Sequence, residues 1–394
     1  MTDTTPISLR LLFWQFLMIG STTFGGFMAL ISVLQNVFVE KRRLLTQDEM
    51  LDAISLATLL PGPIAVNVVA YVGHRLRGAA GAVVSMFAVI LPSFLMVVAL
   101  SVVYFRFGEI PAVDHAFAGL LPAVTAIIVA TVWNLGRKTL KGGIELGLAL
   151  TAAALLLLVG GFYVTLAIIA GAGLIGRSAF LDRAELPLSA PPLALSWVNL
   201  AFGLAGLGAL ILLFLFEPNW IDRNSSAQLA ITFSGISLLL FGGGFVFIPL
   251  IQTIVVDGLH WVSQSDFAAG IALGQITPGP ILLSAAFIGY KVQGLWGALV
   301  ATVAIFTPSA IVMITAARMM ARIKSSQPVQ AALKGIRAAV IGMIFAAAVV
   351  IAQTVAPHWL SVVIFATGLL ALLWFRVDAV WIIPAAGLLG LWFY

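Results

Sequence analysis

The chain has 394 residues, contains no cysteine and has few charged residues, which make up only 9% of it. The absence of cysteine excludes disulfide bonds, thiolate metal sites and thiol nucleophiles. Soluble globular chains carry about 25% charged residues, so a water-soluble globular protein is excluded as well. The four histidines lie far apart, and none shows metal-ligand spacing with a partner. We therefore expect neither a metal site nor any other cofactor.

Apolar residues are abundant, at 62% of the chain, and the mean hydropathy is +1.13. Apolar runs of about 20 residues recur, which is the length that a helix needs to cross a bilayer. A membrane β-barrel would instead show weak alternating segments. The net charge of +5 comes from short basic clusters between the runs, which indicate membrane topology and no nucleic-acid partner. The sequence predicts an all-α polytopic membrane protein embedded in the lipid bilayer.

Two short motifs each occur twice at one spacing. Phe-Gly-Gly stands at 24–26 and again at 241–243, and Pro-Gly-Pro stands at 61–63 and 278–280. Both pairs are offset by 217 residues (241 minus 24, and 278 minus 61). A Pro-Ser pair follows in each copy, at 92–93 and 308–309. The shared spacing predicts a duplicated unit.

The duplication divides the chain into three parts. We expect an N-terminal repeat over residues 1–176 and a C-terminal repeat over 228–394. The linker between them, 177–227, holds one unmatched apolar run near 195–216. A single extra helix turns the second repeat upside down, so the two halves have inverted topology, as in many secondary transporters.

The motifs interrupt apolar segments, and two topologies fit such broken helices. Each segment either crosses the membrane or re-enters as a hairpin from one side. The basic cluster at 41–43 would lie in the cytoplasm only if the first-half segments were hairpins, and the matched loop at 257–260 has no basic residue apart from His260. We favour hairpins that enter from opposite sides in the two halves.

Each Pro-Gly-Pro motif can end one helix and start another, because proline forbids a continuous helix but suits the first helical position. The free N–H groups of a helix start, and its dipole, favour an anion. For a single copy, a packing contact or a kink is the commoner explanation of such glycines and prolines, and the duplication favours a site. The predicted substrate-binding residues are Gly25, Gly26, Pro61, Gly62, Pro63, Ile64, Asn67, Gly242, Gly243, Gly244, Gln275, Thr277, Pro278, Gly279, Pro280 and Ser284.

Four charged residues near the motifs carry separate hypotheses. Arg75, Arg77 and Lys291 follow Pro-Gly-Pro by one helical stretch and could steer an anion to the site or pair with it. Asp52 lies one turn inside an otherwise apolar helix. Helix capping is the ordinary explanation of a carboxylate near a helix start. A proton-coupling or gating role is the alternative for Asp52.

Together, these duplicated motifs resemble the chromate ion transporter family in its long two-domain form. The resemblance spans nearly the whole chain and implies a multi-pass protein of the bacterial inner (plasma) membrane that exports chromate and gives chromate resistance. Sulfate or another tetrahedral oxyanion is the alternative substrate, and a homodimer is left open. An anion channel or other passive pore remains the alternative function, since broken helices also build pores. The sequence has no P-loop or hydrolase motif, so we expect neither ATP-driven transport within this chain nor an enzyme.

Overall fold

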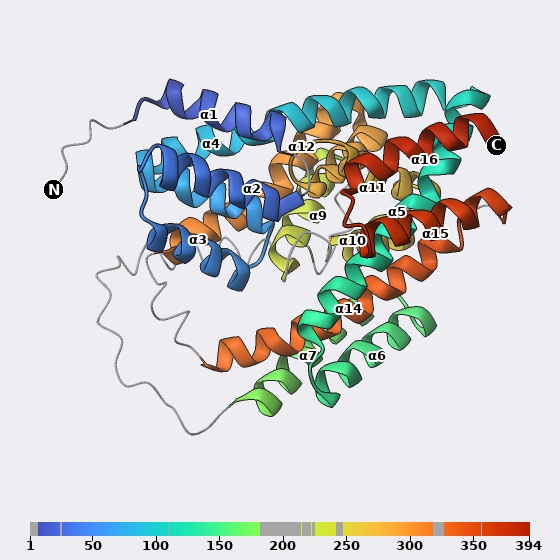
Figure 1. Cartoon of the computed structure of the whole chain (residues 1–394). Coiled ribbons are helices and arrows are strands. Elements are labelled where there is room, and N and C mark those ends of the chain that lie inside the picture. The colour runs from blue at the N-terminus through green and yellow to red at the C-terminus, as the bar shows by residue number, and fades with distance from the viewer. Residues whose placement is uncertain are drawn as a thin grey trace.

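The computed structural model describes residues 7–23, 26–108, 110–181, 214, 222, 225–241, 247–317, 327–355 and 357–394. Helices account for nearly all of these residues, and none of them forms a strand (Figure 1). This confirms the predicted all-α fold class. The extra helix that we expected near 195–216 lies, apart from Phe214, outside the described residues.

The helices of the two halves follow one another in the same order, as the duplicated motifs predict. The first half contains α1 (Leu9–Thr22), α2 (Gly26–Leu34), the π-helix η1 (Gln35–Lys41), α3 (Gln47–Leu59), α4 (Ile64–Phe107), α5 (Pro111–Thr139), α6 (Gly143–Leu158) and α7 (Phe162–Phe180). The second half contains α9 (Ser226–Leu239), α10 (Phe247–Ile251), the π-helix η3 (Gln252–Gly258), α11 (Gln264–Ile276), the short 3-10 helix η4 (Ile281–Leu283), α12 (Ser284–Ala317), α14 (Gln327–Ala352), α15 (Trp359–Leu373) and α16 (Ala379–Phe393).

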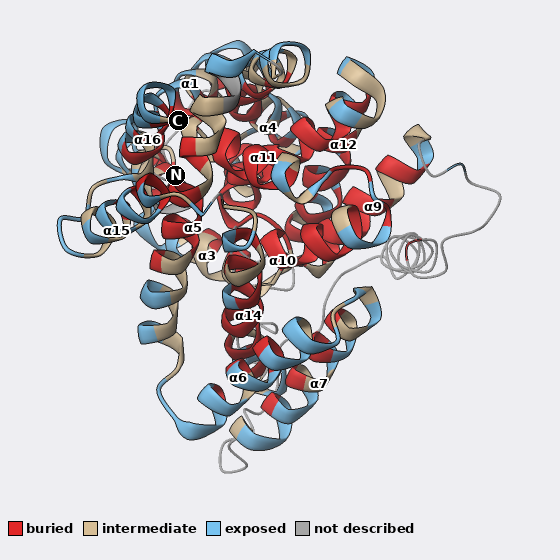
Figure 2. Ribbon diagram, turned by 90° about the vertical axis from the view of Figure 1, so that its right-hand side faces the viewer, coloured by how far each residue is buried: buried red, intermediate tan, exposed pale blue. Residues whose placement is uncertain are grey.

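The surface of the molecule suits a lipid environment. Among the described residues, five helical stretches are long and apolar enough to cross a bilayer, at 64–107, 115–139, 162–180, 281–317 and 327–352. Large apolar side chains are exposed on the outer helices, for example Leu158, Trp374 and Trp392. Figure 2 shows the buried residues concentrated in α9, α11 and α14, and the exposed ones on α6, α7 and α15. The protein therefore spans the membrane several times.

Helix α4 reverses its direction inside its length. Arg77 and Gly78 leave helical geometry, and a Cβ atom on Gly73 would lie only 2.5 Å from the carbonyl oxygen of Gly81. In a straight helix two residues that far apart in sequence are about 12 Å apart. Residues 64–76 and 79–107 are therefore two helices that pack against each other. Helix α12 reverses in the same way at residues 293–294.

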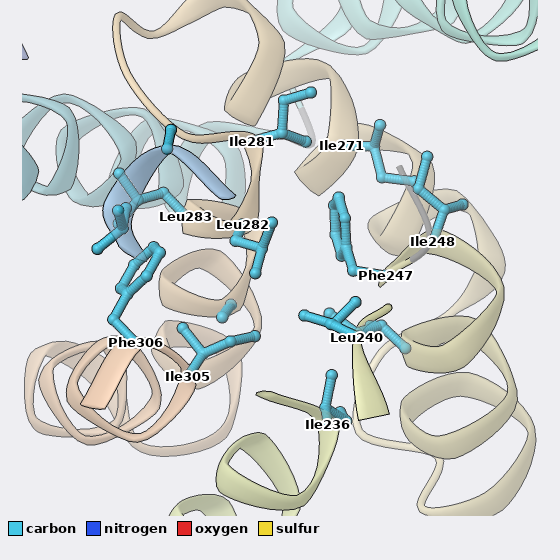
Figure 3. Packing of buried hydrophobic residues seen from close by; sticks show 14 of the residues in the cluster. Ile236, Leu240, Phe247, Ile248, Ile271, Ile281, Leu282, Leu283, Ile305 and Phe306 are labelled. Carbon is cyan, nitrogen blue, oxygen red and sulfur yellow. The ribbon is translucent and has the colours of Figure 1, made fainter. Parts of the chain in front are cut away.

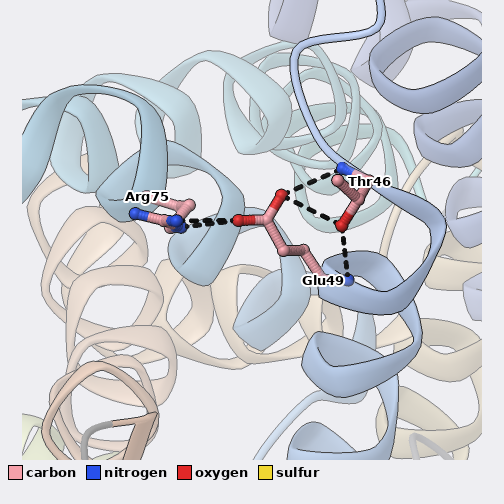
Figure 4. A network of polar contacts seen from close by, with 3 residues as sticks. All are labelled: Thr46, Glu49 and Arg75. Atoms are coloured by element: carbon pink, nitrogen blue, oxygen red, sulfur yellow. Dashed lines mark hydrogen bonds and ion pairs between the residues drawn. The ribbon is translucent and has the colours of Figure 1, made fainter. Parts of the chain in front are cut away.

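Helix α3 and residues 64–76 form a hairpin with the Pro-Gly-Pro motif at its tip. Their outer ends are joined by an ion pair of 2.8 Å between Arg75 and Glu49, and Glu49 also caps α3 through Thr46 (Figure 4). In the second half, Lys291 and Asp266 lie 3.8 Å apart at the equivalent ends. Each of these two broken segments thus folds into a hairpin, the shape that the re-entrant topology requires.

The two hairpins open at opposite ends of the molecule. Residues 79–107 begin at the open end of the first hairpin and run about 43 Å at 1.5 Å per residue. Near their far end the hydroxyl of Tyr104 donates a hydrogen bond of 2.9 Å to Asp266, at the open end of the second hairpin. The halves therefore have inverted topology. They also interleave, since α5 packs on α15 and α16, and α14 packs on α6 and α7.

Candidate functional site

The tips of the two hairpins share an unusual backbone conformation. Gly62 has φ of 106° and Gly279 has φ of 100°, values that side-chain-bearing residues rarely adopt. Pro63 and Pro280 follow as the N-cap residues of α4 and η4, one position before the helix start that we predicted. Each motif thus interrupts a helix and starts a new one, as the sequence suggested. We call the non-helical residues 60–63 the first break and residues 277–280 the second break.

Each break is held by the opposite half of the protein. The N–H of Gly62 donates a hydrogen bond of 2.7 Å to the carbonyl of Leu240, and the N–H of Gly279 donates one of 3.0 Å to the carbonyl of Thr23. Leu240 and Thr23 end the equivalent helices α9 and α1. The two breaks are therefore locked together by a symmetrical pair of backbone hydrogen bonds.

The Pro-Ser motifs also contact the breaks, a role that sequence reasoning missed. The hydroxyl of Ser93 donates a hydrogen bond to the carbonyl of Pro278, and Gly62 packs so closely on Ser309 that a Cβ atom would lie 2.1 Å from the Ser309 Cβ. The repetition of Pro-Ser at matched positions was the available signal.

A cavity of about 250 Å³ lies between the two breaks. Residues 63–65 line it from the first half and residues 279–282 from the second, so both helix starts face the same space. Its inner wall is buried at Ala65 and Leu282, whereas Asn134 and Asp378 at its other end are exposed. The remaining lining residues are Leu30, Ile127, Ala130, Thr131, Gly274, Gln275, Thr277, Leu372, Val377, Ala379 and Val380.

The backbone at these helix starts offers unused donors. The first intrahelical bond of α4 runs from the N–H of Asn67 to the carbonyl of Pro63, so the N–H groups of residues 64–66 have no acceptor within the helix. The side-chain amide nitrogen of Gln275 is buried and has no hydrogen-bond partner among the described residues. Gln275 also lines the cavity. A ligand there would meet donors from the backbone and from one neutral side chain.

The apolar surroundings of the second break show why its irregular backbone is tolerated in a membrane. Figure 3 shows Ile281, Leu282 and Leu283 among the side chains of Phe247, Ile271 and Phe306, all of which are buried. Backbone outside a helix is stable at membrane depth only if protein covers it or a cavity hydrates it. Here protein covers one side of the break and the cavity lies on the other.

The cavity brings together only part of the predicted set. Pro63, Ile64, Gln275, Thr277, Gly279 and Pro280 line it, and Pro61, Gly62 and Pro278 lie in the breaks behind it. Asn67 donates a hydrogen bond of 3.0 Å to the carbonyl of Pro61, and Ser284 donates to the carbonyls of Gly270 and Ile281. The side-chain donors of Asn67 and Ser284 therefore stabilise the backbone around the breaks and do not point to a ligand role. Gly26 starts α2, while Gly25, Gly242, Gly243 and Gly244 lie outside the described residues.

The predicted steering cations lie at the outer ends of the hairpins. Arg75 is about 18 Å from Pro63 along the helix and pairs with Glu49, and Lys291 pairs with Asp266. Burial raises the pKa of Glu49, but hydrogen bonds from Thr46 and Arg75 outweigh it and leave the pKa below its ordinary value. Arg77 is exposed at the reversal of α4, and Asp52 is half-buried one turn beyond Glu49.

One arginine near the first break was missed by sequence reasoning. Arg337 of α14 donates a hydrogen bond of 2.7 Å from its guanidinium to the carbonyl of Thr58, near the end of α3. The signal was a second basic residue, three positions after Lys334, inside the apolar run near 332–354. Arg337 thus lies beside the first break at the end of α3, whereas the free N–H groups lie at the start of α4.

Comparisons with known proteins agree with this architecture. A family model described as chromate transporter matches residues 10–177 and 227–391. A chromate transport protein of Pseudomonas aeruginosa is 31% identical over 395 residues, covering 98% of this chain and 92% of that protein. A chromate transport protein of Cupriavidus metallidurans is 29% identical over 388 residues, covering 93% and 86%. The chain has no match among solved structures. With a family match over both halves, the chain belongs to the chromate transporter family, a family of transporters and not of enzymes.

Proposed function

We propose that this protein is a secondary transporter that exports chromate, or a related tetrahedral oxyanion such as sulfate, across the bacterial inner membrane. The observation that carries the proposal is the cavity shared by the two helix starts at Pro63 and Pro280. Relatives of similar length are named chromate transport proteins, which supports chromate as the substrate.

The chemistry of the cavity favours an anion. Helix N-termini carry about half a positive charge each, and their N–H groups suit oxyanion oxygens. Asp378 is the one acidic residue of the described lining, and it is exposed at the outer end. At its inner end the described lining presents backbone donors and neutral side chains, which can donate to oxyanion oxygens.

The position of the opening supports export. Asn134 lies just before Arg137 and Lys138 at the end of α5, and Asp378 follows Arg376. Basic loops favour the cytoplasmic side of a membrane. The cavity would then open toward the cytoplasm, which is the state in which an exporter loads its substrate.

The interlocked breaks support a carrier over a channel. A channel needs a path that is open to both sides at once, whereas this cavity ends at the buried breaks that Gly62–Leu240 and Gly279–Thr23 bonds hold together. A carrier would exchange this state for one in which the cavity opens to the opposite side.

Reconstitution tests the proposal. Purified protein in liposomes is expected to show saturable uptake of labelled chromate and counterflow, in which unlabelled anion inside drives labelled anion inward. Large unitary currents without counterflow would instead identify a channel. Absence of any chromate or sulfate flux would refute oxyanion transport.

Proline substitutions test the site itself. Pro63→Ala would let α4 begin one residue earlier and draw the N–H of Val66 into an intrahelical bond. We expect a loss of about 1.5–3 kcal/mol in substrate binding, the worth of a hydrogen bond to a charged group. Pro384→Ala is the matched control, because this proline lies exposed inside α16. If Pro63→Ala transports like the control, the motif is only a packing kink.

A further inference from the structure

Helix α14, which is long and apolar enough to cross a bilayer, carries an arginine far from both of its ends. Arg337 lies ten residues after Gln327, the first residue of α14, which is about 15 Å along the helix. Its guanidinium touches the carbonyl of Thr58, which lies nine residues beyond Glu49 in α3, again about 13 Å from the outer end. Measured along α14 and along α3, the charge of Arg337 thus lies a similar distance, about 13–15 Å, from the outer helix ends.

This charge has little compensation within the described part of the chain. Arg337 is half-buried, and no carboxylate of the described residues lies within ion-pair distance of it. A guanidinium has five N–H donors, and the carbonyl of Thr58 accepts one of them. An arginine at this depth is costly, and such residues usually mark substrate or ion pathways.

Stabilising the carbonyl end of α3 is the simplest alternative explanation, because cations favour helix C-termini. The second half provides an internal control for that explanation. Helix α14 corresponds to α5 of the first half, because Gly335 of α14 packs on Gly176 and Gly119 of α5 packs on Gly390 in the same way. Arg337 lies two residues after Gly335. The equivalent position, two residues after Gly119, is Leu121. The second break has nearly the same backbone conformation as the first. The break thus forms without an arginine.

We propose that Arg337 is the fixed cation that pairs with the transported oxyanion at the first break. This inference rests on the proposed function. The guanidinium lies at the end of α3 and the free N–H groups lie at the start of α4, so the two sets of donors flank the same four-residue turn. A planar guanidinium binds two oxygens of a tetrahedral anion at once, which a lysine ammonium does not.

Arg337→Gln is the test, because glutamine can still donate to the Thr58 carbonyl but has no charge. We expect the KM for chromate uptake in liposomes to rise about ten- to a hundredfold, as for the loss of a charge-assisted hydrogen bond. Arg337→Lys should raise the KM less. Chromate should raise the melting temperature of the parent protein, and this shift should vanish in Arg337→Gln. Arg177→Gln, an exposed cation at the end of α7, should behave like the parent.

The outcomes separate this inference from the proposed function. A parent protein that neither transports nor is stabilised by chromate or sulfate would refute the proposed function. If the parent does both and Arg337→Gln keeps the parental KM and thermal shift, Arg337 is only a helix cap and the inference is wrong. Should the glutamine variant not reach the membrane, Arg337→Lys decides: a raised KM at normal thermal stability supports the pairing, and an unchanged KM refutes it.

Discussion

Replacing Gly62 with alanine perturbs the first break where it packs against Ser309. The added methyl group would lie 2.1 Å from the Cβ and 2.5 Å from the Oγ of Ser309, and the backbone would keep a φ of 106°. Such a backbone conformation costs a non-glycine residue about 1–3 kcal/mol. Overpacking in a filled interior costs about 1–3 kcal/mol more. We expect Gly62→Ala to lower the free energy of unfolding by roughly 2–6 kcal/mol.

Two other glycines separate the steric contribution from the backbone contribution. Gly78 has a φ of 60°, but an added methyl group would meet nothing within 4 Å, so Gly78→Ala should lose only the backbone part. In Gly279→Ala the methyl group would lie 2.6 Å from the Oγ of Ser93, the end of a side chain that can rotate. The expected order of destabilisation is Gly62, then Gly279, then Gly78.

Thermal unfolding of the purified protein in detergent measures this order, with chromate uptake as the functional readout. The double variant Gly62→Ala, Ser309→Gly should recover the steric part of the loss and leave the backbone part. Equal melting temperatures for the Gly62 and Gly78 variants would show that Gly62 does not press on Ser309. Parental stability in both variants would refute the left-handed backbone at these positions.

Three further predictions concern charge and topology. Arg75→Gln combined with Lys291→Gln should raise the KM for the anion yet lower the free energy of unfolding by less than about 1 kcal/mol, because exposed ion pairs contribute little; an unchanged KM would exclude both residues from the anion path. Single cysteines in this cysteine-free chain should react from the cytoplasm at Lys41 and from outside at Asp257, and labelling of both from one side would contradict inverted hairpins. Asp52→Asn should abolish the pH dependence of transport if this carboxylate carries the coupled proton, and an unchanged pH profile would leave Asp52 as a helix-capping residue.

The broken helices could be predicted from sequence because their cause is local. Proline at 61 and 63 removes backbone donors, and glycine at 62 permits the positive φ. The same residues recur at 278–280, and the same conformation results. Duplication then fixed the order of the elements, since each segment of one half has a counterpart in the other.

Contacts between distant segments could not be predicted in this way. Arg337 and Thr58 are 279 residues apart, and Ser93 and Pro278 are 185 apart, so no periodicity relates them. Asn67 and Ser284 illustrate a different limit. Their types and positions suggested ligands, but short polar side chains near a helix start often bond to neighbouring backbone carbonyls, and both do so here.

The two breaks have nearly the same φ at their glycines but differ in the side chains that bond to them. This difference suits a protein that binds and releases an anion. The carbonyl of Pro61 is bonded by Asn67 of its own half, whereas the equivalent carbonyl of Pro278 is bonded by Ser93 of the other half. Among the described residues, Arg337 likewise bonds only beside the first break, at the carbonyl of Thr58. A second arginine at Leu121 would leave two mid-membrane cations without an anion whenever the cavity emptied, and each such charge costs several kcal/mol. A single arginine at the first break can attract a dianion and still release it, which repeated transport cycles require.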